Sequence, residues 1–221
     1  MYFEYGASEV EYLRTRDSSL RQAIDRIGHI YRKVDTDLFS SVVHHIVGQQ
    51  ISTKAQATIW LRLTDTLGVV NAQSILDAGV RALQSLGMSF RKAEYITDFA
   101  RRVKDGSFDI ATVGKMSDDD AIRALDSLRG VGVWTAEMIL LFSLQRPNIF
   151  SYDDLAIQRG LRMLYGHKRI DRELFGHYRE LFSPFGSVAS LYLWAISGGA
   201  LPERSDPAPA PSSKKLNEAA K

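Results

Sequence analysis

The stretch that decides the fold is LRGVGVWTAEMILLFSLQRPNIFSYDDLAIQRG, residues 128–160. Gly130 and Gly132 lie between two segments with helical spacing of apolar residues, so the backbone there can turn with positive φ and is bare of side chains. Residues 134–144 are almost all apolar, which predicts a central helix buried on every side. Two interpretations of the glycine pair stay open: a tightly packed helix–helix turn, or a turn whose bare amides, with the positive end of the next helix, bind a phosphate.

Helical spacing continues on both sides of this stretch. Apolar residues recur mostly at three and four positions, so the sequence predicts an all-α fold. A stripe of apolar residues after Asp17 continues as far as Tyr31. The candidate N-caps are Asp17, Ser52 or Thr53, and Ser117. Helices are expected over residues 17–31, 38–46, 53–63, 74–86, 91–103, 117–130, 134–144, 154–164, 172–182 and 187–196.

Composition narrows the function further. The chain has 221 residues, of which 45% are hydrophobic, and this is enough to bury a sizeable core. Its formal net charge is only +2, so any nucleic-acid site must be a local feature of the surface. It has no cysteine, which excludes disulfides, thiolate metal sites and cysteine nucleophiles, and its five histidines show no metal-ligand spacing. Neither a membrane span nor a secretion signal is indicated, so a cytoplasmic, nucleoid-associated location is expected. Residues 201–221 have no apolar period and are expected to be a disordered tail after a helical domain over residues 1–200.

Four segments carry a resemblance to a known family. L-x-G-V-G-x-W-T-A, followed about 20 residues later by an Asp, resembles the helix-hairpin-helix signature of a superfamily of base-excision DNA glycosylases. IVGQQISTKAQ at 46–56, LGMSFRKAEYI at 86–96 and PFGSVASLYLW at 184–194 resemble segments of its 3-methyladenine DNA glycosylases of the alkylation-repair type (type II). The chain resembles the compact members, which lack an N-terminal β-domain. The resemblance implies two helical subdomains around a helix-hairpin-helix motif at 118–144, with a cleft between them.

The implied function is a DNA glycosylase that hydrolyses the N-glycosidic bond of alkylated purines, such as 3-methyladenine and 7-methylguanine, in double-stranded DNA during base excision repair. We expect it to act as a monomer and to flip the damaged base out of the duplex. Two alternatives stay open: a non-catalytic helix-hairpin-helix module that holds DNA for a partner, and a glycosylase for neutral damaged or mismatched bases.

The resemblance identifies Asp154, in the motif YDDLAI, as the catalytic carboxylate. Breaking an N-glycosidic bond builds positive charge on the sugar, so a fixed carboxylate stabilises the transition state more than the ground state. Its neighbour Asp153 is interpreted as a plain N-cap of the next helix. The sequence offers no second carboxylate as a general acid, but a purine methylated at N3 or N7 is already cationic and leaves as a neutral base. We therefore predict a preference for cationic lesions.

Aromatic side chains are the predicted lining of the base pocket, because aromatic faces attract cations. For each of them, packing in the core is the alternative, and for Trp194 it is the favoured one. In bifunctional relatives the position of Trp134 holds a lysine that attacks the sugar, so this enzyme is expected to lack lyase activity. Gly186 stands where larger relatives commonly have an arginine, so the pocket is expected to differ there. The predicted lining residues are Trp134, Tyr152, Phe185 and Trp194.

The family's DNA contacts map onto two segments. Gln50 aligns with the wedge that fills the gap left by the flipped base, with Ser52 as second choice; alternatively, Gln49 and Gln50 only end the preceding helix. Arg91 and Lys92 are further candidates for phosphate contacts. The resemblance also implies a structural Na⁺ or K⁺ held by backbone carbonyls of the hairpin, while no cofactor is required. The predicted DNA-binding residues are Gln50, Ser52, Thr53, Lys54, Gly130, Val131, Gly132, Val133 and Thr135, and the predicted cation ligands are Asp126, Leu128 and Val131.

Overall fold

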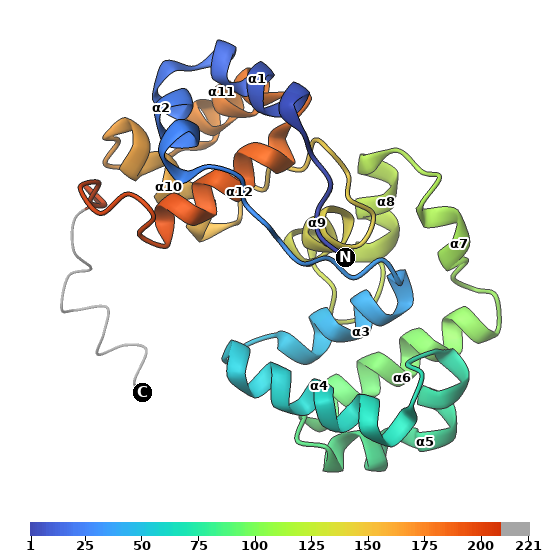
Figure 1. Cartoon of the computed structure of the whole chain (residues 1–221). Helices are drawn as coiled ribbons and strands as arrows, with labels where there is room; N and C mark the ends of the chain where they lie inside the picture. The colour runs from blue at the N-terminus through green and yellow to red at the C-terminus, as the bar shows by residue number, and fades with distance from the viewer. Residues whose placement is uncertain (209–221) are drawn as a thin grey trace. The chain divides into compact units, whose positions relative to one another are not determined.

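The computed structural model describes residues 1–208, which form twelve α-helices in two compact units (Figure 1). The predicted all-α fold is confirmed. Within the described part of the chain the β-pairing consists of one isolated bridge, between Tyr2 and Lys33. Residues 209–221, the larger part of the predicted disordered tail, lie outside the described residues. The cleft expected between the subdomains stays a prediction.

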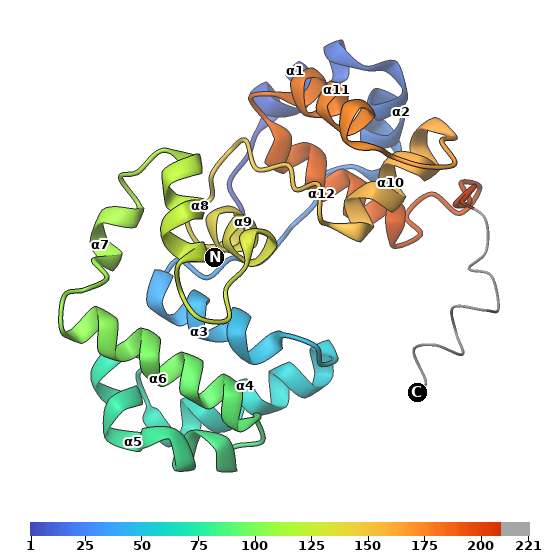
Figure 2. The ribbon, with the colours of Figure 1, turned by 180° about the vertical axis from the view of Figure 1, so that it is seen from behind.

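The first unit comprises residues 1–3 and 33–146. The helix α5 packs along α6, the two lying side by side in both views (Figures 1 and 2), and α3 packs against α4, α6 and α9. The apolar helix α9 also packs against α8, and its residues 135–141 are all buried. Val133 and Trp134 are exposed and Phe142 and Leu144 are half-buried, so the prediction of a helix buried on every side holds for residues 135–141 only. The helices of this unit are α3 (Leu38–Gly48), α4 (Thr53–Leu67), α5 (Ala72–Ser85), α6 (Phe90–Lys104), α7 (Ile110–Val113), α8 (Asp118–Asp126) and α9 (Val133–Phe142).

Among the described residues, the second unit comprises 4–32 and 147–208. The helix α12 packs against the other four helices of this unit, most extensively against α10. Gly160 makes this packing close, because a Cβ there would lie 2.4 Å from the carbonyl oxygen of Leu193. The helices are α1 (Ala7–Arg16), α2 (Ser18–Ile27), α10 (Leu155–Tyr165), α11 (Arg172–Phe182) and α12 (Gly186–Ser197).

The helix ends follow local chemistry. Asp17, Ser52 and Ser117 are the N-caps of α2, α4 and α8, each accepting a bond from a backbone N–H, as the sequence predicts. The extension of the first stripe to Tyr31 is wrong. The helix α2 ends at Gly28, which has φ +74, and Tyr31 is 72% exposed.

The first part of the predicted tail is packed against the second unit. Leu201 is buried, and both carboxylate oxygens of Asp206 accept bonds from the guanidinium of Arg162 at 2.6 and 2.8 Å. A single buried leucine and an ion pair produce no periodic pattern, which is why the sequence did not indicate this contact. Among the described residues, none of the helices has both the length and the apolar character that crossing a membrane requires.

Candidate functional site

Asp154 is the N-cap of α10 and is only 6% exposed. Its Oδ1 atom accepts hydrogen bonds from the backbone N–H groups of Ala156 and Ile157, both at 2.9 Å. The prediction that Asp153 is the N-cap is therefore wrong: Asp153 is exposed, and the predicted catalytic carboxylate caps the helix itself. The amides and the positive end of the helix dipole stabilise negative charge on this buried side chain.

Trp194 fixes the carboxylate from the other side. Its indole Nε1–H donates to Oδ1 of Asp154 at 3.1 Å, across the packed pair α10 and α12. Three donors thus converge on one carboxylate oxygen and hold the group in one orientation. Core packing, the favoured interpretation of Trp194, misses this role: the side chain is half-buried, its edge binds the carboxylate, and the guanidinium of Arg32 lies 6.0 Å from its ring centroid.

The other predicted pocket aromatics lie at the ends of different helices. Tyr152 is half-buried between an edge contact with Phe175, at 5.1 Å between ring centroids, and the guanidinium of Arg172, 4.3 Å from its ring. Phe185 precedes α12 and makes an edge contact with Tyr12 at 5.1 Å. Both belong to the second unit, as do Asp154 and Trp194.

Trp134 belongs to the first unit. It lies in the first turn of α9 and is 42% exposed, so its ring is not used for packing in the core. Whether Trp134 lines a base pocket stays a prediction.

Gly130 and Gly132 differ in how strongly their positions require a glycine. Gly130 has φ +84, and a Cβ there would lie 2.2 Å from the ring of Tyr95, so this position requires glycine for both conformation and close packing. Gly132 is the N-cap of α9 with φ −106, and a Cβ there would meet nothing within 4 Å. The predicted positive φ therefore holds for Gly130 alone, and the backbone beside Gly132 is open to a ligand.

The side chains around the turn divide into exposed and buried ones. Val133 is 45% exposed, whereas Thr135, predicted to contact DNA, is only 6% exposed because it begins the run of residues 135–141 that are all buried. Val131 is buried, and its N–H donates to the carbonyl of Leu128 at 3.0 Å, which closes the turn.

The segment with the predicted wedge, residues 49–52, connects α3 to α4, and we call it the wedge loop. Gln49 is the C-cap of α3, as the alternative interpretation proposed. Gln50 lies beyond the helix, is exposed and has φ +56, a backbone conformation that non-glycine residues rarely adopt. Ser52 caps α4: its hydroxyl oxygen accepts the backbone N–H of Ala55 at 3.2 Å.

Two contacts of the wedge loop are absent from the sequence prediction. The side-chain amide of Gln49 donates to the carbonyl of Gly130 at 2.6 Å, which joins the wedge loop to the hairpin turn. The ammonium of Lys92 donates to the carbonyls of Val47 and Gln49, at 2.8 and 2.6 Å. Contacts between side chains and backbone carbonyls across the fold leave no pattern in the sequence.

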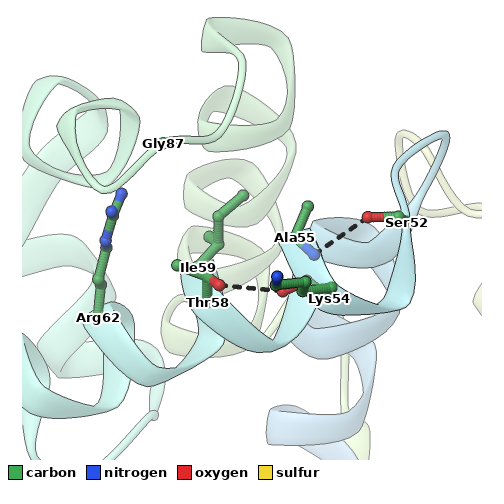
Figure 3. A pocket seen from close by; sticks show the side chains of 7 residues that line it. All are labelled: Ser52, Lys54, Ala55, Thr58, Ile59, Arg62 and Gly87. Atoms are coloured by element: carbon green, nitrogen blue, oxygen red, sulfur yellow. Dashed lines mark hydrogen bonds between the residues drawn. The ribbon is translucent and has the colours of Figure 1, made fainter.

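A pocket of 390 Å³ lies beside the start of α4. Figure 3 shows Lys54, Thr58 and Arg62 along this helix, with Gly87 on a neighbouring loop. Arg62 donates to the carbonyl of Leu86 at 3.2 Å. The lining contains two cations and no carboxylate, so it favours an anion. The lining residues are Ser52, Lys54, Ala55, Thr58, Ile59, Arg62 and Gly87.

Comparisons with known proteins agree with this geometry. The family described as "HhH-GPD superfamily base excision DNA repair protein" matches residues 43–184. A solved DNA-3-methyladenine glycosidase from Bacillus halodurans is 32% identical with a TM-score of 0.81, covering 92% of this chain and 95% of that one.

Two curated proteins are similar in sequence. DNA-3-methyladenine glycosylase 1 of Schizosaccharomyces pombe is 27% identical over 164 residues, which are 72% of this chain and 72% of that protein. The YfjP protein of Bacillus subtilis is 27% identical over 173 residues, which are 73% of this chain and only 59% of its own length. Because the family match covers more than half of the chain and includes the hairpin and Asp154, the protein belongs to the HhH-GPD superfamily of base excision DNA repair proteins.

Proposed function

We propose that this protein is a monofunctional DNA glycosylase that removes alkylated purines from duplex DNA. The observation that carries the proposal is the buried carboxylate of Asp154, held by three donors at the start of α10, in a chain of a base excision repair family. The names of its relatives support the substrate class: the Bacillus halodurans and Schizosaccharomyces pombe proteins are called a DNA-3-methyladenine glycosidase and glycosylase.

The proposed reaction follows from the charge on Asp154. As the bond between C1′ and the purine nitrogen lengthens, its electron pair leaves with the base and the sugar becomes cationic. A carboxylate held in a fixed, dry position stabilises that cation without reorganisation. The oxygen of a water molecule then bonds to C1′, and its proton goes to the carboxylate. A methylated purine that was cationic leaves as a neutral base, so the step requires no general acid.

Recognition of the DNA would use both units. In the first unit, Gln50 is the proposed wedge, and the open backbone at Gly132 and the exposed Lys54 in the first turn of α4 are the proposed phosphate contacts. In the second unit, Tyr152 and Phe185 offer aromatic faces to a cationic base. We also propose that the protein acts as a monomer and at the nucleoid.

A monovalent cation at the hairpin is part of the same proposal. The proposed ligands are the backbone carbonyls of Asp126, at the end of α8, and of Leu128 and Val131 in the turn to α9, and none of them needs a particular side chain. The carbonyl of Leu128 already accepts the N–H of Val131, but a carbonyl oxygen has two lone pairs and can also bind a cation. Such an ion would add positive charge where a phosphate is expected.

The absence of lyase activity rests on Trp134. Strand cleavage by this route requires an amine that attacks C1′, and an indole at the first turn of α9 cannot supply one. We therefore expect an abasic site in an intact strand as the product.

The experiment measures release of free methylated base from alkylated duplex DNA. The unmodified protein is expected to release it, and Asp154→Asn to abolish release while keeping affinity for the DNA. Asp153→Asn is the matched control, because that neighbouring carboxylate is exposed and should be dispensable.

Other outcomes identify the competing functions. Binding without release from any lesion would favour a non-catalytic DNA-binding module. Release of only neutral bases in a panel of defined duplexes would favour the other glycosylase class. Strand breaks in the product, under conditions that leave an abasic site intact, would contradict the assignment as a monofunctional glycosylase.

A further inference from the structure

Lys92 looks like a phosphate ligand in the sequence, but its ammonium is directed into the protein. Two of its three N–H donors bind the carbonyls of Val47, the second-to-last residue of α3, and of Gln49, the C-cap of that helix. These carbonyls lie at the negative end of the helix dipole, where a cation is stabilising. Partial burial also lowers the pKa of Lys92, which is typical of an ammonium withdrawn from water.

The same helix, α6, also supports the hairpin. Tyr95 lies one turn after Lys92, and its ring packs in the space that a Cβ at position 130 would need. Gln49 completes the connection, because its carbonyl accepts from Lys92 and its side-chain amide donates to the carbonyl of Gly130. The wedge loop and the hairpin turn are therefore held by one network rooted in α6.

Gln50 follows directly after the residue that Lys92 and Gly130 both bind. Its φ of +56 is unfavourable for a residue with a Cβ, so the surrounding contacts must maintain it. The bond from Lys92 holds the backbone carbonyl of Gln49 immediately before it, the side-chain bond to Gly130 anchors the same residue, and the Ser52 cap fixes the backbone two residues later. Without the bonds at Gln49, the exposed loop would relax toward commoner conformations.

We propose that Lys92 and Gln49 are positioning residues that hold the wedge Gln50 ready for insertion and in register with the hairpin. The proposal rests on the proposed function, since it assigns the wedge loop a part in base flipping. A preorganised wedge enters the duplex without first being ordered, and small displacements of such a group reduce rates strongly.

Salt dependence separates this role from phosphate binding. Each phosphate contact adds about 0.9 to the slope of log K against log salt concentration on duplex DNA. For Lys92→Met, we expect the slope for a duplex with an abasic-site analogue to remain that of the unmodified protein. Lys54→Met is the matched control on the exposed side of α4, and we expect it to lower the slope by about 0.9.

The second readout is flipping itself. A 2-aminopurine next to the lesion reports unstacking by fluorescence and needs no excision. Lys92→Met and Gln49→Ala are both expected to reduce the rate of unstacking about 10- to 100-fold. Lys92→Arg, which retains donors to the two carbonyls, should restore part of it. The fold-reduction of the unstacking rate in the double variant should be smaller than the product of the two single fold-reductions, because both substitutions act on one network.

A slope lowered by about 0.9 in Lys92→Met, with normal unstacking, would overturn the proposal in favour of a phosphate contact. If Lys92→Met does not fold, Gln49→Ala and Lys92→Arg still test the network, and normal unstacking in Gln49→Ala would overturn it. If the unmodified protein unstacks the reporter but releases no base, the proposed function fails while the positioning role is still measured.

Discussion

The bond from Trp194 to Asp154 can be removed with little change in shape. Trp194→Phe keeps an aromatic ring on α12 and deletes the Nε1–H that lies 3.1 Å from Oδ1. Two backbone donors remain on the same oxygen, both at 2.9 Å, so the carboxylate keeps its helix cap but loses its restraint from the neighbouring helix.

The magnitude follows from the charge and burial of the acceptor. Hydrogen bonds to charged groups contribute about 1.5–3 kcal/mol, and Asp154 is 6% exposed, so solvent provides little replacement. With about 1.4 kcal/mol per tenfold in rate, and two donors remaining, we expect excision to fall about 10- to 30-fold. The free energy of unfolding should fall by about 1–2 kcal/mol, which corresponds to a decrease in Tm of about 2–8 °C for a chain of this size.

The assay is single-turnover excision from a 7-methylguanine duplex at saturating enzyme, with affinity for abasic DNA measured in parallel. Affinity should stay unchanged, because the bond acts on the carboxylate proposed to react and not on a proposed phosphate contact. Trp60→Phe is the control for the substitution itself, since Trp60 is half-buried in the first unit against His44 and lies outside the site. An excision rate equal to that of the unmodified protein, together with the expected decrease in Tm, would refute the argument and make the bond purely structural.

Three further predictions use the same structure. Gly130→Ala should lower the free energy of unfolding by at least about 1–2 kcal/mol, since φ is +84 and the ring of Tyr95 must move. Gly132→Ala should change that free energy by less than about 1 kcal/mol but weaken DNA binding. Urea denaturation measures the stability of both variants, and a DNA titration measures their affinity. Asp154→Ala should lower stability by about 0.5–2 kcal/mol relative to Asp154→Asn, because asparagine can still cap α10; thermal unfolding compares the two. Burial lowers the pKa of both His45 and its neighbour His44, so the unfolded chain binds these protons first and stability should fall as the pH drops below about 6.5. His45→Gln should remove its own share of the slope, up to about 1.4 kcal/mol per pH unit, and leave that of His44.

Each of these has a contradicting result. Equal stability of Gly130→Ala and the unmodified protein would contradict the role of the left-handed turn. Equal unfolding temperatures for Asp154→Ala and Asp154→Asn would contradict the cap. An unchanged pH profile in His45→Gln would mean that another group causes the acid sensitivity.

Much of the fold could be predicted because it is encoded locally. Apolar spacing marked ten of the twelve helices of the described residues but missed α1 and the four-residue α7. Asp17, Ser52 and Ser117 marked three of the helix starts, since an N-cap needs only a side-chain oxygen and the next few amides. Asp154 was identified through the resemblance of its motif to a family. What the sequence could not decide was which of two adjacent aspartates caps α10, because either satisfies the same local rule.

By itself, the sequence determined that the chain is all-helical, that a glycine turn precedes an apolar helix, and that one carboxylate follows at the family's catalytic position. Only the tertiary structure decided what Trp194, Gln49 and Lys92 do. Their partners, Asp154, Gly130 and the end of α3, lie 40 or more residues away in the sequence and are brought together by helix packing. An indole, an amide or an ammonium can pack, face water or bind a carbonyl equally well, so its role is fixed only when the fold places an acceptor within reach.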